Sequence, residues 1–321
     1  MPEIRLDRYS SDRREEWDAF ADNSRNATFL LRRGYMDYHS DRFEDHSLMF
    51  YKGGRLIALL PANLTDNDEE GKILHSHSGL TYGGLIIPAT HFDVRDMLEI
   101  FDLIREYAKS QGISGLDYKP IPHIYACLPS EEDRYALFRN GAVRTECGIS
   151  SAVDTRSNPG FNSQQKRNLK RGIKEGLTLR EHRDVGEFHA LLTECLRERH
   201  GVAPVHTLAE LQLLKDRFPE NIRIFTADGE SGAEAGVCVY LCGRVAHAQY
   251  ICSSGEGRAK GAPAFLFDHL IGQFSTACDY FDFGISTEEH GRILNEGLYA
   301  QKTGLGGRGV VYERYYVDFG K

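Results

Sequence analysis

Three side chains near the end of the chain have types suited to acid–base or charge-stabilising chemistry. Asp282 lies in the apolar run 280–283, Glu288 follows in a polar loop, and Lys302 comes late in a short helical segment before glycines. An ammonium group in a cleft can stabilise an oxygen that gains negative charge during a reaction, and a loop carboxylate can act as a general base. The same residues also suit structural roles, with Lys302 solvated at a helix end and Asp282 capping a loop.

A glycine-rich loop, residues 253–262, provides a second candidate site between a predicted strand and a predicted helix. Backbone N–H groups at the start of a helix can hold phosphate groups, and glycines let the chain approach such a ligand closely. The candidate cofactor-binding residues are Ser253, Ser254, Gly257, Arg258, Gly261 and Ala262. The alternative is an ordinary glycine-rich turn before a helix.

Donor and aromatic side chains that could bind a substrate occur in loops of the first half and at a strand end of the second. The candidates are His77, Tyr82, Lys119 and Tyr250. Lysine and histidine donors beside tyrosine rings suit a phosphorylated or sugar-bearing molecule. Alternation over residues 74–78 predicts that His75 and His77 share one strand face, which could also be a plain polar surface. Because no further ligand with suitable spacing accompanies this pair, we predict no metal site.

A helix is predicted from Gln164 to Lys174, with Ser163 as its N-cap and with five basic residues in its part Lys166–Lys174. Its positive charge offers a surface for tRNA, for a nucleotide phosphate or for an anionic lipid headgroup. The alternative is a solvated surface helix.

The composition is that of an ordinary globular protein, with 321 residues, 41% hydrophobic and 27% charged. The 39 lysines and arginines against 47 aspartates and glutamates give a net charge of −8, which disfavours a general nucleic-acid binder. Seven scattered cysteines without a C-x-x-C pair indicate buried thiols. No apolar run approaches the ~20 residues of a membrane span, and the charged N-terminus does not resemble a signal peptide. We therefore expect a cytoplasmic protein without a transmembrane segment.

The same order of elements is predicted twice along the chain. In each half, helices precede three strands, a long helix, a strand, a short helix and a last strand. Asp117 and Asp282 occupy corresponding places, and the polar stretch 154–160 separates the halves. Further expected elements are a helix over residues 35–42 and a strand over residues 80–87. The prediction is a mixed α+β fold with domains 1–153 and 154–321, each a mostly antiparallel mixed sheet flanked by helices.

The closing segment, residues 280–307, resembles the GNAT superfamily of acyltransferases, and in particular its Fem-type branch of peptidoglycan aminoacyltransferases. Residues 76–84 and 118–122 and the basic helix carry the same resemblance, which extends over nearly the whole chain. It implies tandem GNAT-like domains, an acyl-CoA such as acetyl-CoA at residues 253–262, a catalytic Lys302 and an acceptor in the cleft between the domains. Residues 258–261 fit the first part of the superfamily's Arg/Gln-x-x-Gly-x-Gly/Ala signature, and Pro263 departs from it. The first domain lacks a glycine-rich loop at 87–93 and is then the acceptor side.

Three functions remain open at this point. The first is transfer of an acyl group from acetyl-CoA to an amine or hydroxyl of a cell-envelope or capsule polysaccharide precursor, a small molecule or a lipid-linked sugar or peptide. The second is tRNA-dependent aminoacyl transfer to a peptidoglycan precursor, against which stands the lack of the long helical arm that tRNA-using members often carry. The third is a non-catalytic tandem-GNAT binding protein, which the departure at Pro263 keeps open.

Overall fold

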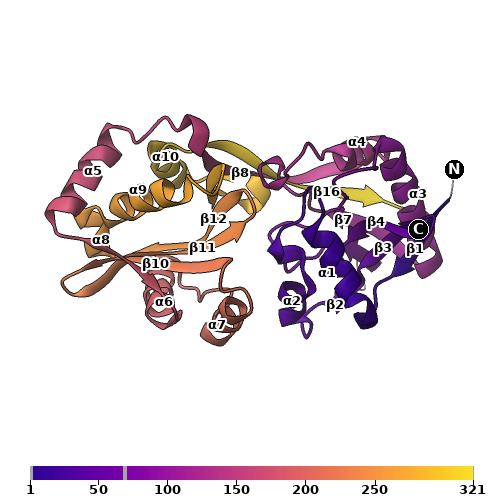
Figure 1. The fold of residues 1–321 in the computed structure, drawn as a ribbon, viewed down its shortest axis with the longest axis horizontal. Helices are drawn as coiled ribbons and strands as arrows, with labels where there is room; N and C mark the ends of the chain where they lie inside the picture. Colours follow the sequence, from indigo (N-terminus) through magenta and orange to yellow (C-terminus); the bar gives the residue numbers. More distant parts are fainter. Residues whose placement is uncertain (1–2, 68–70, 321) are drawn as a thin grey trace. The chain divides into compact units, whose positions relative to one another are not determined.

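The computed structural model describes residues 3–67 and 71–320, and the chain divides into two compact units (Figure 1). Unit 1 extends to Gly148 and also includes Glu289–Arg292 and the residues from Val311 onward; unit 2 comprises Ile149–Glu288 and Ile293–Val310. The boundary lies a few residues before the predicted one. The last strand also returns to unit 1, because it pairs with residues far away in the sequence, and the order of elements alone does not reveal such pairing.

Unit 1 contains four α-helices and two groups of paired strands in its described residues. One group is a three-stranded sheet of order β1-β3-β4, and the other is the part β2-β5-β6-β7-β16 of an 11-stranded sheet. The strands are β1 (Ile4–Arg8), β2 (Glu44–Asp45), β3 (Leu48–Lys52), β4 (Arg55–Leu60), β5 (Asn63–Asn67), β6 (Gly71–His75), β7 (Ile113–Tyr118) and β16 (Arg308–Asp318). The helices are α1 (Arg14–Asp22), α2 (Arg33–Met36), α3 (Val94–Gln111) and α4 (Glu132–Arg139).

Unit 2 contains the part β8-β13-β12-β11-β10-β9 of the 11-stranded sheet, to which β8 contributes its residues from Ile149 onward, and a small hairpin. The strands are β8 (Val143–Asp154), β9 (Thr178–His182), β10 (Ile222–Gly229), β11 (Gly232–Cys242), β12 (Val245–Ser253), β13 (Tyr280–Ile285), β14 (Thr287–Glu288) and β15 (Ile293–Leu294). The helices are α5 (Ser163–Lys174), α6 (Gly186–His200), α7 (Leu208–Arg217), α8 (Gly255–Lys260), α9 (Ala262–Phe274) and α10 (Glu296–Gly304).

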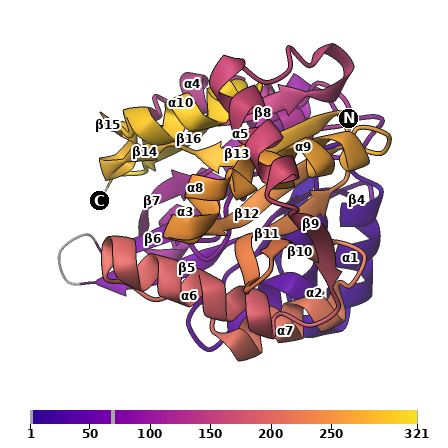
Figure 2. The same ribbon diagram turned by 90° about the vertical axis from the view of Figure 1, so that its left-hand side faces the viewer.

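Helices cover both faces of the sheet in unit 2. Figures 1 and 2 show α6 and α7 on one face of β10–β12, with α5 and α9 on the other. Helix α9 is strongly apolar and buries Leu266, Phe267 and Leu270 against Phe281 and other residues of the sheet. The predicted α+β fold, with mixed sheets flanked by helices, is confirmed.

Helix α3 packs against β1 and β7 in unit 1 and has clear end signals. Asp93 and Asp96 form a capping box at its start, and Gly112 ends it in the left-handed conformation (φ 66°). Its apolar side, which includes Ile100 and Ile104, packs in the core of unit 1. These caps satisfy backbone groups that a helix end would otherwise leave unpaired.

Both units contain one parallel strand pair, and the two pairs match. β6 and β7 run parallel up to the pair His75–Asp117, where their ladder ends. β12 and β13 run parallel up to the pair His247–Asp282, where their ladder also ends. The pairs β10–β11, β9–β10, β11–β12, β8–β13, β7–β16, β2–β5 and β5–β6 are antiparallel. The corresponding places predicted for Asp117 and Asp282 are therefore found in the strand register.

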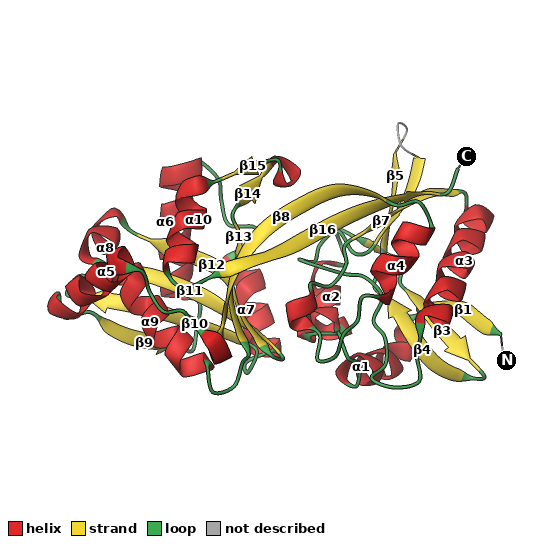
Figure 3. Ribbon diagram, turned by 90° about the horizontal axis from the view of Figure 1, so that it is seen from above, coloured by secondary structure: helices red, strands yellow, loops and turns green. Residues whose placement is uncertain are grey.

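Two long strands, β8 and β16, complete these sheets (Figure 3). The later residues of β8 pair with β13 in unit 2, and the later residues of β16 pair with β7 in unit 1. Each parallel pair thus has an antiparallel neighbour that arrives from a distant part of the chain.

Some local predictions were wrong. The segment expected as one helix over residues 35–42 is the short helix α2 followed by a 3-10 turn, Asp37–His39. Residues 80–87 form no regular strand and contribute only an isolated bridge between Leu59 and Ile86. Strand β6 ends at His75, and the left-handed backbone of His77 (φ 54°), which is unfavourable for a residue with a side chain, prevents regular strand pairing from continuing through that residue.

Candidate functional site

A buried histidine–aspartate pair lies where the parallel strands of unit 2 stop pairing. His247 on β12 and Asp282 on β13 are the last pair of their ladder. His247 Nδ1 donates a hydrogen bond of 2.8 Å to Asp282 Oδ2. The histidine is 8% exposed and the aspartate is fully buried. Since Nδ1 carries its proton toward the carboxylate, the lone pair of the neutral imidazole is on Nε2, where it can accept a proton.

Two further donors fix the carboxylate of Asp282. The Ser150 hydroxyl donates to Oδ1 at 2.5 Å, and the backbone N–H of Gly284 donates to the same oxygen at 3.2 Å. Gly284 has a φ of +74°, which allows β13 to turn sharply directly after Asp282, where its register with β8 is irregular. The carboxylate therefore holds both the imidazole and the following turn in place.

Lys302 on α10 is anchored to the same turn. Its Nζ donates to the carbonyl oxygens of Gly284 at 2.8 Å and Ile285 at 2.6 Å. Burial lowers the pKa of Lys302 to about 8, although the nearby charge of Asp282 opposes this shift. Because Lys302 is only 5% exposed, the alternative that it is a solvated lysine is wrong. Lys302 and Asp282 are brought together, since both bind Gly284.

Glu288 lies apart from this cluster, on the small hairpin of β14 and β15. It is exposed, and its Oε1 accepts a hydrogen bond of 3.1 Å from the Asn295 amide. Its role as a general base stays a prediction.

The glycine-rich segment folds as a helical turn instead of an open loop. Ser254 caps α8 by accepting a hydrogen bond from Gly257 N at 2.9 Å. A Cβ atom on Gly257 would lie 2.2 Å from the Glu234 carbonyl oxygen. Arg258 donates to the Ser253 carbonyl at 2.6 Å, and Ala262 is fully buried at the start of α9. These contacts give the segment a structural function, and its binding of phosphate stays a prediction.

Gly261 joins α8 to α9 beneath helix α5. Its φ is +84°, and a Cβ atom there would lie 2.2 Å from the Asn168 carbonyl oxygen of α5. Both the conformation and the close backbone approach require glycine.

We expect Gly261→Ala to lower the free energy of unfolding by about 2–4 kcal/mol, from left-handed strain and overpacking together. Gly272→Ala is the matched control, because Gly272 lies within α9, the helix that follows Gly261, with open space around it. That change should raise stability by about 0.5–1 kcal/mol through helix propensity. Urea unfolding curves of the two variants provide the comparison, and equal midpoints would contradict this account of Gly261.

Comparison with known proteins identifies the architecture. No protein-family model matches the sequence, and no curated protein matches it. Among solved structures, FemX aligns over 98% of this chain and 96% of its own, with a TM-score of 0.69 and 11% identity. L-PGS from Bacillus licheniformis aligns over 94% and 91%, with a TM-score of 0.60 and 14% identity. A tandem GNAT protein from the clavulanic acid biosynthesis pathway aligns over 99% of both chains, with a TM-score of 0.56 and 12% identity.

The chain has a tandem GNAT-like, Fem-type fold. The resemblance seen in the sequence is thereby confirmed at the level of architecture.

Two of the predicted substrate-binding residues of this tandem GNAT-like fold surround one turn of unit 1. Lys119 Nζ donates to the carbonyl oxygens of Leu80 at 2.5 Å and Ser78 at 3.4 Å, and burial lowers its pKa to about 8. His77 is 3% exposed, and its ring stacks on His39 with 5.2 Å between centroids. Burial lowers the pKa of His77 to about 3, so this imidazole is neutral. The prediction that His75 and His77 share one strand face is wrong, since only His75 belongs to β6.

The two predicted tyrosines have different environments. Tyr82 is 2% exposed in unit 1, with its hydroxyl 2.9 Å from the Thr28 hydroxyl, so it packs inside that unit. Tyr250 in unit 2 is half-buried, and its hydroxyl lies 2.5 Å from His206 Nδ1. Substrate binding by these residues stays a prediction.

The basic helix is α5, and Asn162 caps it in place of the predicted Ser163. Its five basic side chains are all exposed, and Arg171 also donates to the Ala259 carbonyl of α8 at 2.7 Å.

The buried-thiol prediction is confirmed for five cysteines and wrong for Cys127, which is exposed, and Cys147, which is half-buried. In residues 3–67 and 71–320, no group of three metal-binding side chains occurs, and no helix has the length and apolar character needed to cross a membrane.

His247 and Ser150 were not predicted from the sequence. A single histidine within the apolar residues 245–252 suggests a core position, and a serine in a long strand carries no signal. The signal available was the repeated order of elements: His75 and His247 each lie on the strand that comes, in sequence, before the aspartate-bearing strand of their own half.

Proposed function

We propose that the chain is an acyltransferase whose reaction centre is the His247–Asp282 pair of unit 2. The observation that carries this proposal is the 2.8 Å contact between the two side chains at the end of the parallel ladder. A histidine oriented by a buried carboxylate is the usual device for removing a proton from a hydroxyl or amine at neutral pH. The tandem GNAT-like fold supports the same reaction class.

In the proposed step, an acceptor amine or hydroxyl attacks the acyl carbonyl while its proton moves to His247 Nε2. The bond between the acyl carbon and its carrier then breaks, and the proton passes to the leaving group. Lys302 uses two of its three N–H groups on Gly284 and Ile285. We assign the third to the oxyanion that forms on the acyl carbonyl.

The donor is proposed to be an acyl-CoA, with acetyl-CoA as the first choice and residues 253–262 as its phosphate-binding segment. The acceptor is proposed to be a cell-envelope or capsule precursor, either a small molecule or a lipid-linked sugar or peptide, and the reaction to be cytoplasmic. A second candidate donor is aminoacyl-tRNA, from which the aminoacyl group would be transferred to a peptidoglycan precursor. The exposed basic side of α5, which contacts α8, favours this alternative.

The deciding experiment combines binding with turnover. Acetyl-CoA binding is measured by isothermal titration, and acetyl transfer to a panel of amines and amino sugars is followed by mass spectrometry. Total charged tRNA is tested in parallel by gel shift. We expect acetyl-CoA to bind and at least one acceptor to be acetylated. Retention of charged tRNA without acetyl-CoA binding would favour the second donor, and binding without any transfer would favour the non-catalytic alternative.

A further inference from the structure

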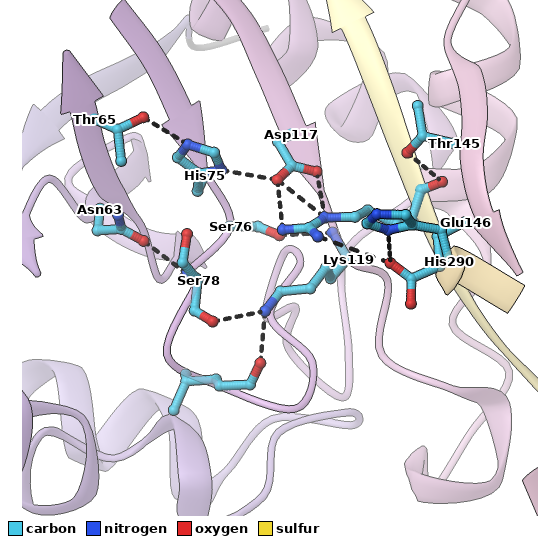
Figure 4. Close-up of polar contacts among 12 residues, drawn as sticks. Asn63, Thr65, His75, Ser76, Ser78, Asp117, Lys119, Thr145, Glu146 and His290 are labelled. Atoms are coloured by element: carbon cyan, nitrogen blue, oxygen red, sulfur yellow. Dashed lines mark hydrogen bonds and ion pairs between the residues drawn. The ribbon is translucent and has the colours of Figure 1, made fainter. Parts of the chain in front are cut away.

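Unit 1 contains a second histidine–aspartate pair, made of residues other than those of the unit 2 site (Figure 4). His75 Nδ1 donates to Asp117 Oδ2 at 2.7 Å, and the two residues are the last pair of the β6–β7 ladder. His247 and Asp282 have the same register and nearly the same spacing in unit 2. The two units therefore share the donor–acceptor geometry, and not only the order of elements.

A hydroxyl completes the arrangement in unit 1. Thr65 Oγ1 on β5 lies 2.8 Å from His75 Nε2. Because Nδ1 of the neutral imidazole donates to the carboxylate, Nε2 is the acceptor and the threonine hydroxyl is the donor. The three side chains form a chain of hydroxyl, imidazole and carboxylate, the relation that activates a nucleophilic hydroxyl. Figure 4 shows the three groups in a line across the neighbouring strands.

The site is open to solvent at the hydroxyl and fixed at the carboxylate. Thr65 is exposed, and the side chains of His75 and Asp117 are 17% and 14% exposed. Burial acts to raise the pKa of Asp117, but the hydrogen bonds from His75 and from Arg314 outweigh it and hold the pKa below its ordinary value. Arg314 Nε donates to both carboxylate oxygens, at 2.8 and 3.0 Å. Asp117 is thus ionised at neutral pH, as orientation of the histidine requires.

We propose that Thr65, His75 and Asp117 form a second acyl-transfer site, at which Thr65 Oγ is acylated by an activated ester or thioester. In this step Thr65 Oγ bonds to the acyl carbon, and its proton moves to His75 Nε2. The bond from the acyl carbon to the leaving alcohol or thiol breaks, and the leaving group takes the proton from His75. The products are an acyl-threonine ester and the free alcohol or thiol, and hydrolysis by water restores the hydroxyl.

Arg314 sets the expected speed of this reaction. The guanidinium already neutralises part of the Asp117 charge, so the carboxylate stabilises an imidazolium less than an unshared carboxylate would. Acylation of Thr65 should therefore be slow and should accumulate over minutes with a reactive ester.

The test uses the full chain and p-nitrophenyl acetate. The protein is incubated with the ester, digested, and its peptides are analysed by tandem mass spectrometry to locate acetyl groups. We expect one acetyl group on Thr65 of the wild-type chain, and a rate of Thr65 acetylation about 10²–10⁴-fold lower in His75→Ala. Thr65→Ser should retain acetylation at this position, and Thr65→Val should lose it.

The matched control is His269→Ala, which removes an exposed imidazole of α9 and should leave Thr65 acetylation unchanged. Circular dichroism melting verifies that each variant folds. If His75→Ala does not fold, the conservative variant Thr65→Ser still tests whether acetylation at this position follows the hydroxyl. Unmodified Thr65 in the wild-type chain would overturn the proposal, as would equal acetylation of Thr65 in wild type and His75→Ala. Either result would assign the three residues to cross-strand stabilisation alone, and would leave the proposal for His247 and Asp282 untouched.

Discussion

Replacing His247 by alanine is expected to lower the turnover rate by about 10²–10⁴-fold, the usual contribution of a positioned general base. In the proposed mechanism the imidazole takes the acceptor proton, and Asp282 holds this imidazole through the 2.8 Å hydrogen bond. Asp282→Asn should reduce the rate in a similar way, because an amide can hold the imidazole in the wrong tautomer. Steady-state transfer rates at saturating donor measure both effects.

The binding constant of the donor separates chemistry from folding in this experiment. His247 belongs to the β12–β13 pair and not to the proposed donor segment 253–262, so the donor Kd should change little. His269→Ala removes an exposed histidine elsewhere in unit 2 and should keep the wild-type rate. A His247→Ala chain with a normal rate would remove this residue from the mechanism.

Lys302→Met should have the second large effect, on both stability and rate. The change leaves the carbonyl oxygens of Gly284 and Ile285 without their lysine donor. An unpaired carbonyl costs about 1–3 kcal/mol when fully buried; because these hydrogen bonds are only partly buried, we expect a loss at the lower end, about 1 kcal/mol. Removal of an oxyanion donor costs about 10²–10³ in rate. Urea unfolding and transfer assays measure the two losses separately. A stable variant with the wild-type rate would reduce Lys302 to a replaceable anchor.

The pH dependence gives an independent test of Lys302. Its pKa is lowered to about 8 by burial, so the ammonium group is lost as pH rises through this value. We expect the transfer rate to fall above about pH 8 in the wild type. An unfolded lysine keeps its proton up to a pH of about 10.4, so between these values the unfolded chain binds more protons than the native chain. This group therefore makes the fold more stable as pH rises through that window, and the falling rate would not reflect unfolding at Lys302. A rate that stays constant up to pH 10 would contradict the role of the ammonium group.

Much of the architecture could be predicted from the sequence because local patterns determine it. Alternating and helical periodicities predicted the repeated order of elements, and the two aspartates after the long helices revealed corresponding strands. The pairing of β8 with β13 and of β16 with β7 could not be predicted, since strand pairing between distant segments leaves no local pattern. The pairing of β12 with β13 up to His247 and Asp282 could not be predicted for the same reason.

The candidate site was predicted only where residue types were informative. Lys302 and Asp282 were selected from the closing segment, and the structure brings them to one turn. The glycines of residues 253–262 were interpreted as serving a ligand, but Gly257 and Gly261 are also required by neighbouring backbone carbonyls. Glycine identity alone does not distinguish these two reasons, because both depend on the missing side chain.

Chemical rescue of the His247→Ala variant tests the central claim most directly. Imidazole added to the assay can occupy the space of the missing side chain and take the acceptor proton in its place. We predict that the transfer rate of this variant rises with imidazole concentration, while the rates of the wild type and of His269→Ala stay constant. Transfer by His247→Ala at the wild-type rate without imidazole would contradict the claim that His247 is the base.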